Sequence, residues 1–175
     1  MAKRRPDIGK VGAPSADSPP RSVGFLLSQL GFVTARQFTA ALAPLGIRPK
    51  DWALMRFVAT DEGQSQQALA ERIGLPPSRM VALVDRLEER GILERRPDPE
   101  DRRVRALYLT VKGHRTLERA FEAALDTETE LCEPLGPRER DRLIDLLQKL
   151  QEGKDLRRGV HPALTAEPGP PAELE

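Results

Sequence analysis

Residues 91–110 constrain the fold more than any other stretch of this sequence, because they predict a β-hairpin with a charged tip. Apolar residues such as Leu93, Val104 and Leu109 alternate roughly with charged or polar ones, and a period of two is typical of strands. Between the two arms, residues 97–101 read Pro-Asp-Pro-Glu-Asp. This is turn chemistry, because proline fixes φ and aspartate accepts hydrogen bonds from nearby backbone N–H groups. Taken alone, such a charged turn is most often an ordinary solvated loop.

The segments before the hairpin predict two short helices joined by a tight turn. Ser65 is a suitable N-cap for a helix over residues 66–73, and Gly74 ends that helix. After a Leu-Pro-Pro linker, the next helix runs to residues 89–90 and stops at Gly91. Two such helices make a helix-turn-helix. A helix-turn-helix that leads directly into a basic hairpin predicts a winged helix that binds DNA.

The helix that precedes the hairpin has an apolar and a polar face. The expected buried stripe comprises Met80, Val81, Val84 and Leu87, and the opposite face comprises Ser78, Arg79, Ala82, Asp85, Arg86 and Glu89. The start of this helix at Pro76-Pro77-Ser78 is expected to leave early N–H groups and the positive end of the helix dipole available to a phosphate. An ordinary amphipathic core helix would show the same pattern, so the DNA-binding hypothesis depends on the hairpin that follows.

Longer helices are predicted on both sides of this unit. Four are expected, over residues 22–42, from Pro49 to before Gly63, over residues 111–133 and over residues 138–151. The outermost ones carry more apolar positions than a winged helix needs for its own core, which predicts a helical homodimer. Residues 1–21 are predicted to form a flexible basic tail, and residues 154–175 a flexible proline-rich tail.

Composition limits the possible functions. The net charge is +1 with 31% charged residues, so binding to nucleic acid requires local segregation of charge. The single cysteine, Cys132, excludes an internal disulfide and a cysteine-based zinc site, and neither a metal nor a cofactor is predicted. No catalytic motif is recognised, so the chain is not expected to be an enzyme. The sequence contains no long apolar run and no signal-peptide core, which favours the cytoplasm over a membrane.

Together, these segments resemble the MarR family of bacterial transcription regulators. The resemblance rests on residues 65–73 (SQQALAERI), 80–91 (MVALVDRLEERG) and 95–103 (RRPDPEDRR), and on Leu109-Thr110 with Gly113. It covers about residues 22–153 and implies a mainly α-helical fold with a small β-hairpin wing. The winged helix-turn-helix lobe would occupy about residues 49–110, with the N- and C-terminal helices forming the dimer interface. Such a dimer would bind a pseudo-palindromic operator in double-stranded DNA, most often as a repressor.

The resemblance also implies which residues contact DNA. The matching positions are Gln66, Ser78, Arg79, Arg86, Arg102 and Arg103. Two recognition helices would enter successive major grooves, while Arg103 would enter the flanking minor groove, where narrow DNA concentrates negative potential. Arg102 would contact a phosphate. Asp101 matches the acid that holds the wing arginine and the turn in place.

Many members of this family release DNA when a small, often aromatic, anion binds between the dimerisation helices and the DNA-binding lobe. By resemblance, this pocket would be lined by Phe32, Arg36, Trp52, Arg56 and His114. Simpler explanations exist: Trp52 suits the core, the two arginines suit salt bridges, and His114 suits the surface. Two other functions stay open at this point. One is a winged helix that binds a protein partner, and the other is redox sensing through Cys132, near the expected interface.

Overall fold

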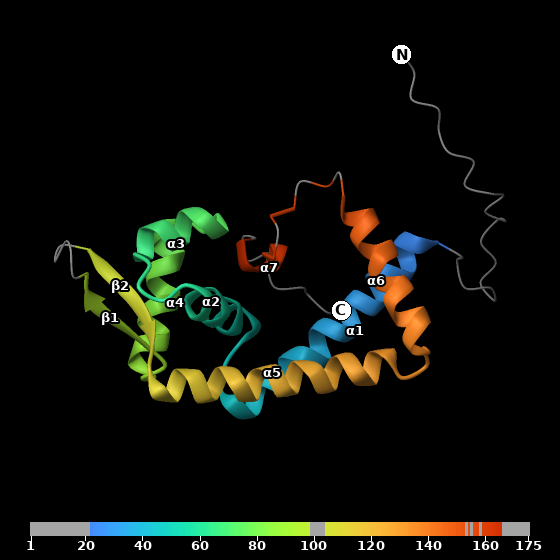
Figure 1. The fold of residues 1–175 in the computed structure, drawn as a ribbon, viewed down its shortest axis with the longest axis horizontal. Coiled ribbons are helices and arrows are strands. Elements are labelled where there is room, and N and C mark those ends of the chain that lie inside the picture. Colours follow the sequence, from blue (N-terminus) through green and yellow to red (C-terminus); the bar gives the residue numbers. More distant parts are fainter. Residues whose placement is uncertain (1–21, 99–103, 153, 155, 158, 166–175) are drawn as a thin grey trace, which may run out of the picture.

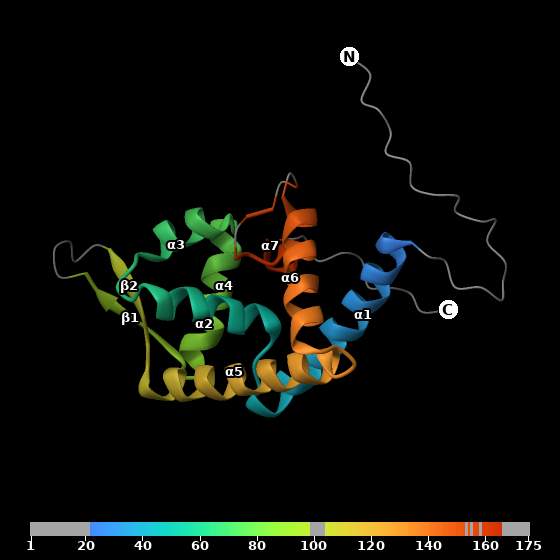
Figure 2. The same ribbon diagram turned by 45° about the vertical axis from the view of Figure 1, so that its right-hand side comes forward.

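The computed structural model describes residues 22–98, 104–152, 154, 156–157 and 159–165. A long helix, α5, joins the lobe that contains the hairpin to a layer formed by α1 and α6 (Figure 1), and the turned view shows the same division (Figure 2). The elements are α1 (Val23–Leu42), η1 (Ala43–Leu45), α2 (Pro49–Thr60), α3 (Gln66–Ile73), α4 (Pro77–Glu89), β1 (Leu93–Pro97), β2 (Arg105–Leu109), α5 (Val111–Cys132), α6 (Pro137–Gln151) and α7 (Pro162–Thr165). The predicted winged-helix architecture is confirmed.

Local capping residues set the helix boundaries in the lobe. The Ser65 hydroxyl accepts a hydrogen bond from the Ala68 amide (3.1 Å) at the start of α3, and Gly74 ends that helix with φ +71°. The Thr110 hydroxyl accepts a hydrogen bond from the Gly113 amide (3.0 Å) at the start of α5. These contacts satisfy backbone groups that a helix end leaves without intrahelical partners. The predicted span of α3, residues 66–73, is confirmed for this reason.

The hairpin forms as predicted. Its strands pair antiparallel in a register that places Leu93 opposite Leu109. Ser65 adds a further β-bridge to β2, so the turn before α3 is fixed to the hairpin. The tip of the wing lies outside the described residues, and with it three predicted site residues, Asp101, Arg102 and Arg103.

The core of the lobe lies where α2, α3, α4 and the hairpin meet α5. Its most buried side chains include Leu54, Met55, Val58, Leu69, Ile73, Met80, Val84, Leu87, Leu93 and Leu107. The expected stripe on α4 needs one correction, because Val81 is 41% exposed whereas Leu83 is 8% exposed. Successive residues of a helix are rotated by about 100°. Position 83 therefore joins 80, 84 and 87 on the buried face, and Val81 belongs to the outward face.

The C-terminal segment differs from the flexible tail that was expected over residues 154–175. Residues 162–165 form the short helix α7, and Leu164 is 3% exposed within the core cluster of the lobe. Val160 packs against the same cluster. The sequence carried no periodic signal for this contact, because isolated apolar anchors in a proline-rich stretch do not produce a helical repeat.

Large apolar side chains are exposed on α1 and α6. Leu26 and Leu30 of α1 are 49% and 51% exposed, and Leu146 and Leu150 of α6 are 48% and 51% exposed. The two helices lie side by side in both views (Figures 1 and 2). Large apolar side chains exposed together on two neighbouring helices are typical of a protein interface. Within the described ranges, no helix combines the length and apolar character that crossing a bilayer requires.

Candidate DNA-binding surface

The first turns of α4 present small side chains to solvent. Ser78, Val81 and Ala82 are all exposed. A serine hydroxyl exchanges hydrogen bonds with base edges in the major groove, and small apolar groups contact the methyl group of thymine. This face can therefore approach a groove closely and read base edges.

The backbone at the start of α4 offers less to a phosphate than the sequence suggested. The amides of Arg79 and Met80 both donate to the Pro76 carbonyl oxygen, each at 3.0 Å. Pro77, the first residue of the helix, has no N–H to donate. Two of the early amides that were expected to receive an anion thus already have acceptors. The side chains carry most of the recognition chemistry at this end of α4.

Arg95 ties the hairpin to both helices of the helix-turn-helix. Its Nε and Nη2 each donate to Gln66 Oε1 at 3.1 Å, at the start of α3. It also forms ion pairs with Asp85 (2.5 Å) and Glu88 of α4, and its side chain is only 20% exposed. Gln66, a predicted DNA contact, is therefore held by β1, and two of the three carboxylates of α4 are paired with a guanidinium. In the sequence, Arg95 stands out only as the first residue of the segment 95–103 (RRPDPEDRR).

Arg86, another predicted DNA contact, is engaged inside the lobe. Its Nε donates to Asp51 Oδ2 at 3.2 Å, while Arg48 pairs with Asp51 Oδ1 at 2.9 Å. The Asp51 side chain is fully buried. This contact joins α4 to the start of α2, so Arg86 fixes the angle between two helices of the lobe. A separation of 35 residues in the chain hides such a pair from sequence inspection.

The environment of Asp51 lowers the pKa of its carboxyl group. Burial alone would raise that pKa, but hydrogen bonds from the Arg48 side chain and backbone outweigh burial, together with the positive charges of Arg48 and Arg86. Asp51 is therefore an anion at neutral pH. Both arginines therefore stabilise the buried anion.

Arg79 extends from the first turn of α4 to the C-terminal segment. Its Nη1 donates to the Thr165 carbonyl oxygen at 3.0 Å. In this arrangement the side chain predicted to reach a base edge is bound to another part of the same chain.

The alternation of β1 sends neighbouring arginines to opposite sides of the hairpin. Arg95 points inward to α4, whereas Arg96 lies over the Tyr108 ring, 4.5 Å from its centroid, and pairs with Glu94 at 2.5 Å. Arg96 is more than half exposed. The outward side of the wing therefore presents an exposed guanidinium, paired with one carboxylate, before the tip begins.

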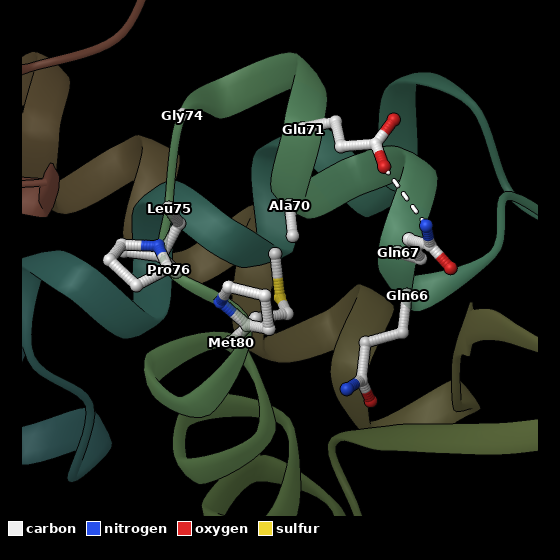
Figure 3. Close-up of a pocket in the computed structure, with 9 residues that line it drawn as sticks. Gln66, Gln67, Ala70, Glu71, Gly74, Leu75, Pro76 and Met80 are labelled. Carbon is white, nitrogen blue, oxygen red and sulfur yellow. Dashed lines mark hydrogen bonds between the residues drawn. The ribbon is translucent and has the colours of Figure 1, made fainter.

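A groove of about 590 Å³ lies between α3 and α4 (Figure 3). It is lined by Gln66, Gln67, Ala70, Glu71, Gly74, Leu75, Pro76, Pro77 and Met80. Gln67 Nε2 donates to Glu71 Oε1 at 3.0 Å along the α3 side of the groove. Because these walls carry a carboxylate and no basic side chain, the groove is unsuited to a DNA phosphate.

The residues predicted to line an effector pocket fall into three separate groups. Trp52 lies between Phe38 and Phe121, with ring centroids 5.0 and 5.8 Å away, and the Arg56 guanidinium lies 4.6 Å from the Trp52 centroid. In contrast, Arg36 lies over Phe32 on an exposed part of α1. His114 Nε2 is 3.3 Å from Glu62 Oε1 in the lobe. Trp52 and Arg56 are brought together with two further aromatic side chains, Phe38 and Phe121, which the sequence did not indicate.

A helix-turn-helix followed by a basic antiparallel hairpin defines a winged-helix DNA-binding protein. Comparison with known proteins agrees with this class. A sequence profile described as the MarR family matches residues 45–104. A Thauera aromatica protein assigned as the transcriptional regulatory protein for the hcr operon is 32% identical over 129 residues, which cover 73% of this chain and 78% of that protein.

Solved structures give the same result. The transcriptional repressor CouR bound to a 23-mer DNA duplex is 30% identical with a TM-score of 0.66, covering 75% of this chain and 93% of that chain. CouR from Rhodococcus jostii RHA1 bound to p-coumaroyl-CoA is 31% identical, with a TM-score of 0.62 and coverages of 78% and 96%. A MarR-family regulator from Rhodococcus sp. RHA1 is 30% identical, with a TM-score of 0.61 and coverages of 77% and 95%. The chain belongs to the MarR family of transcription regulators.

Proposed function

We propose that this protein is a cytoplasmic, homodimeric repressor that binds a pseudo-palindromic operator in double-stranded DNA. The observation that carries the proposal is the outward face of α4, where Ser78, Val81 and Ala82 are exposed beside a basic hairpin. In a dimer, two such helices would enter successive major grooves, and each wing would reach a minor groove. Arg79 would read a base edge, Arg102 would contact a phosphate, and Arg103 would enter the minor groove.

Gln66 and Arg86 contribute to DNA binding in this proposal mainly by position. Gln66 accepts two hydrogen bonds from Arg95, and Arg86 pairs with buried Asp51. Both side chains hold the recognition helix at a fixed angle to its neighbours. Asp101 would have the same kind of role in the wing.

Dimer formation would cover the exposed apolar surface of α1 and α6. Leucines on both helices are about half exposed, and the two helices already lie side by side. Burying such side chains between two subunits releases about 25 cal/mol for each Å² of apolar surface. A symmetric contact between these helices would place two lobes on one duplex.

An aromatic anion is the effector class that the structure favours. Trp52, Phe38 and Phe121 supply aromatic faces near the junction of α1, α2 and α5, and Arg56 supplies a positive charge. The likeness to CouR, which has been solved with p-coumaroyl-CoA, supports an aromatic acyl thioester as the first compound to test. Phe32, Arg36 and His114 remain proposed members of this site. For their side chains to join Trp52 and Arg56, the lobe would have to move relative to the layer formed by α1 and α6.

The proposal is tested by titrating the purified protein against labelled DNA from upstream of its own gene, at two salt concentrations and with scrambled duplex as competitor. Saturable binding of one dimer per site with preference over the competitor is the expected result. Arg79→Ala should weaken operator binding by about 1–3 kcal/mol and relax base preference. Arg119→Ala, at an exposed position on α5, is the matched control and should bind as the wild type does.

The outcome also separates the other candidate functions. A winged helix that serves as a protein-binding module would bind no DNA even at low salt, and charge reversal on the hairpin would leave its partner binding intact. Thiol-based sensing through Cys132 stays an alternative, because reactive cysteines lie beside positive groups. Cys132 Sγ lies 3.7 Å from Glu128 Oε1 and also interacts with the Arg140 guanidinium, which is paired with Glu128. The relatives reported above are transcription regulators, so no catalytic role is proposed.

A further inference from the structure

The C-terminal residues that follow α6 are attached to all three helices of the DNA-binding lobe. We call residues 156–157 and 159–165 the C-terminal clasp. The figures show α7 beside the lobe, separated from the end of α6 by a connecting stretch (Figures 1 and 2). A terminal segment is ordered only where contacts of this kind tie it down.

The first attachment is at the end of α3. Arg157 Nη1 lies 3.4 Å from the carbonyl oxygens of both Glu71 and Arg72. These carbonyls belong to the last turn of α3, where a positive side chain interacts favourably with the helix dipole. The guanidinium lies against Gly74, where a Cβ atom would clash with it. Arg157 therefore caps α3 directly before the turn of the helix-turn-helix.

The second attachment is apolar. Leu164 is 3% exposed and belongs to the core cluster, and Val160 packs against that cluster. The amide of Leu164 donates to the His161 carbonyl oxygen at 2.9 Å, so the anchor is held in a helical turn. The free energy gained by burying one leucine is large enough to keep a short segment docked for much of the time, but too small to make the contact permanent.

The third attachment involves the recognition helix itself. Arg79 Nη1 donates to the Thr165 carbonyl oxygen at 3.0 Å. A guanidinium that reads a guanine uses two of its N–H groups at once, so this bond and a bidentate base contact compete for the same side chain.

We infer that the C-terminal clasp is an intramolecular competitor of DNA: it holds Arg79 in the DNA-free protein and is displaced when the recognition helix enters the groove. This inference rests on the proposed DNA-binding function. By linkage, the clasp must weaken DNA binding by the same factor by which DNA weakens the docking of the clasp. Release of one hydrogen bond corresponds to about 2- to 10-fold in affinity.

The test compares full-length Leu164→Ser with the wild type in titrations against labelled DNA from upstream of the gene. Leu164→Ser removes the buried anchor. Leu156→Ser is the matched control, because it makes the same substitution in the same segment at a leucine that is 43% exposed. We expect Leu164→Ser to bind DNA about 2- to 10-fold more tightly and Leu156→Ser to bind as the wild type does. Val160→Ser, at the second anchor, replaces Leu164→Ser if that variant fails to fold.

Two further measurements decide whether the effect is competition through Arg79. Hydrogen exchange on the wild type should show faster exchange of the Val160 and Leu164 amides when DNA is bound. In an Arg79→Ala background, Leu164→Ser should give a smaller gain in affinity than it gives in the wild type. Unchanged or slower exchange on DNA would overturn the inference, as would equal DNA affinity for the wild type and a folded Leu164→Ser variant whose clasp exchanges freely.

The same data separate this inference from the function on which it rests. If neither the wild type nor any variant binds DNA at low salt, the proposed function is wrong and competition with DNA is refuted with it. If all proteins bind the operator with equal affinity, the proposed function stands and the inference alone is refuted.

Discussion

The pairing of Arg86 with Asp51 predicts that Arg86→Ala lowers the stability of the fold and leaves the number of phosphate contacts to DNA unchanged. The Arg86 Nε lies 3.2 Å from Asp51 Oδ2, and the Asp51 side chain is 0% exposed. A hydrogen bond with a charged partner is worth about 1.5–3 kcal/mol. Arg86 is 38% exposed, and Asp51 retains its bond to Arg48. Solvent screening therefore reduces the expected loss to about 1–2 kcal/mol.

Two assays on the same preparation test this expectation. Urea denaturation at a fixed protein concentration should show the lower unfolding free energy, and the thermal midpoint should fall by about 2–8 °C. Well below that midpoint, the slope of log affinity for DNA against log salt concentration should be unchanged, because the slope counts phosphate contacts. Arg86→Lys is the matched variant. It keeps the charge but cannot reproduce the planar geometry of the guanidinium, and its stability should be intermediate.

A double-mutant cycle with Asp51→Asn isolates the pair from the other effects of each substitution. Because the two side chains are in contact, a coupling energy of about 1 kcal/mol is expected. The reasoning is refuted if Arg86→Ala unfolds like the wild type and at the same time lowers the salt slope by about one. Arg86 would then contact a phosphate, as its match to the family's DNA-contacting positions implies.

Three other perturbations give separate tests. Gly113→Ala should destabilise the protein by about 3 kcal/mol or more, measured by urea denaturation, because its Cβ would clash with the Ile92 carbonyl oxygen at the start of α5. The pKa of Asp51 is lower in the folded protein than in the unfolded chain, where it is about 3.9. The contribution of this carboxylate to the free energy of unfolding is therefore complete above the unfolded pKa and is lost as the pH falls through the folded pKa. Asp51→Asn should flatten that decline, measured by urea denaturation from pH 7 to 3. Arg103→Ala should lower the affinity for operator and non-operator DNA alike and reduce the salt slope by about one. Normal DNA binding by this variant would show that Arg103 is not the wing residue that contacts DNA.

Local signals in the sequence were sufficient for the helices and the hairpin of the lobe. Ser65 and Gly74 predicted both ends of α3, and the structure shows the hydroxyl contact and the positive φ that make them effective. The alternating pattern around Leu93 and Leu109 predicted strands that do pair with each other. These features depend on neighbours within a few residues or on a simple period, so one sequence contains the information that they require.

Contacts between distant residues could not be predicted in this way. The polar face of α4 gave no means of distinguishing Arg86, which pairs with a carboxylate 35 residues away, from a residue that faces DNA. Arg95 likewise looked like one more basic residue, although it bonds to α3 and α4. Leu164 lies in a proline-rich stretch without periodicity, and its burial depends on apolar neighbours that only the assembled lobe brings together. In each case the sequence alone does not identify the distant residues that the side chain contacts.

The position of Trp52 gives the protein an optical property of its own. Trp52 is the single tryptophan of the chain, and its ring touches Phe38 of α1 and Phe121 of α5 beneath the Arg56 guanidinium. The emission of an indole depends on the charge and solvent around it, so a shift of α2 against either neighbour would change both its intensity and its wavelength. The unlabelled protein therefore contains a fluorescent reporter at the junction between its DNA-binding lobe and its apolar helices.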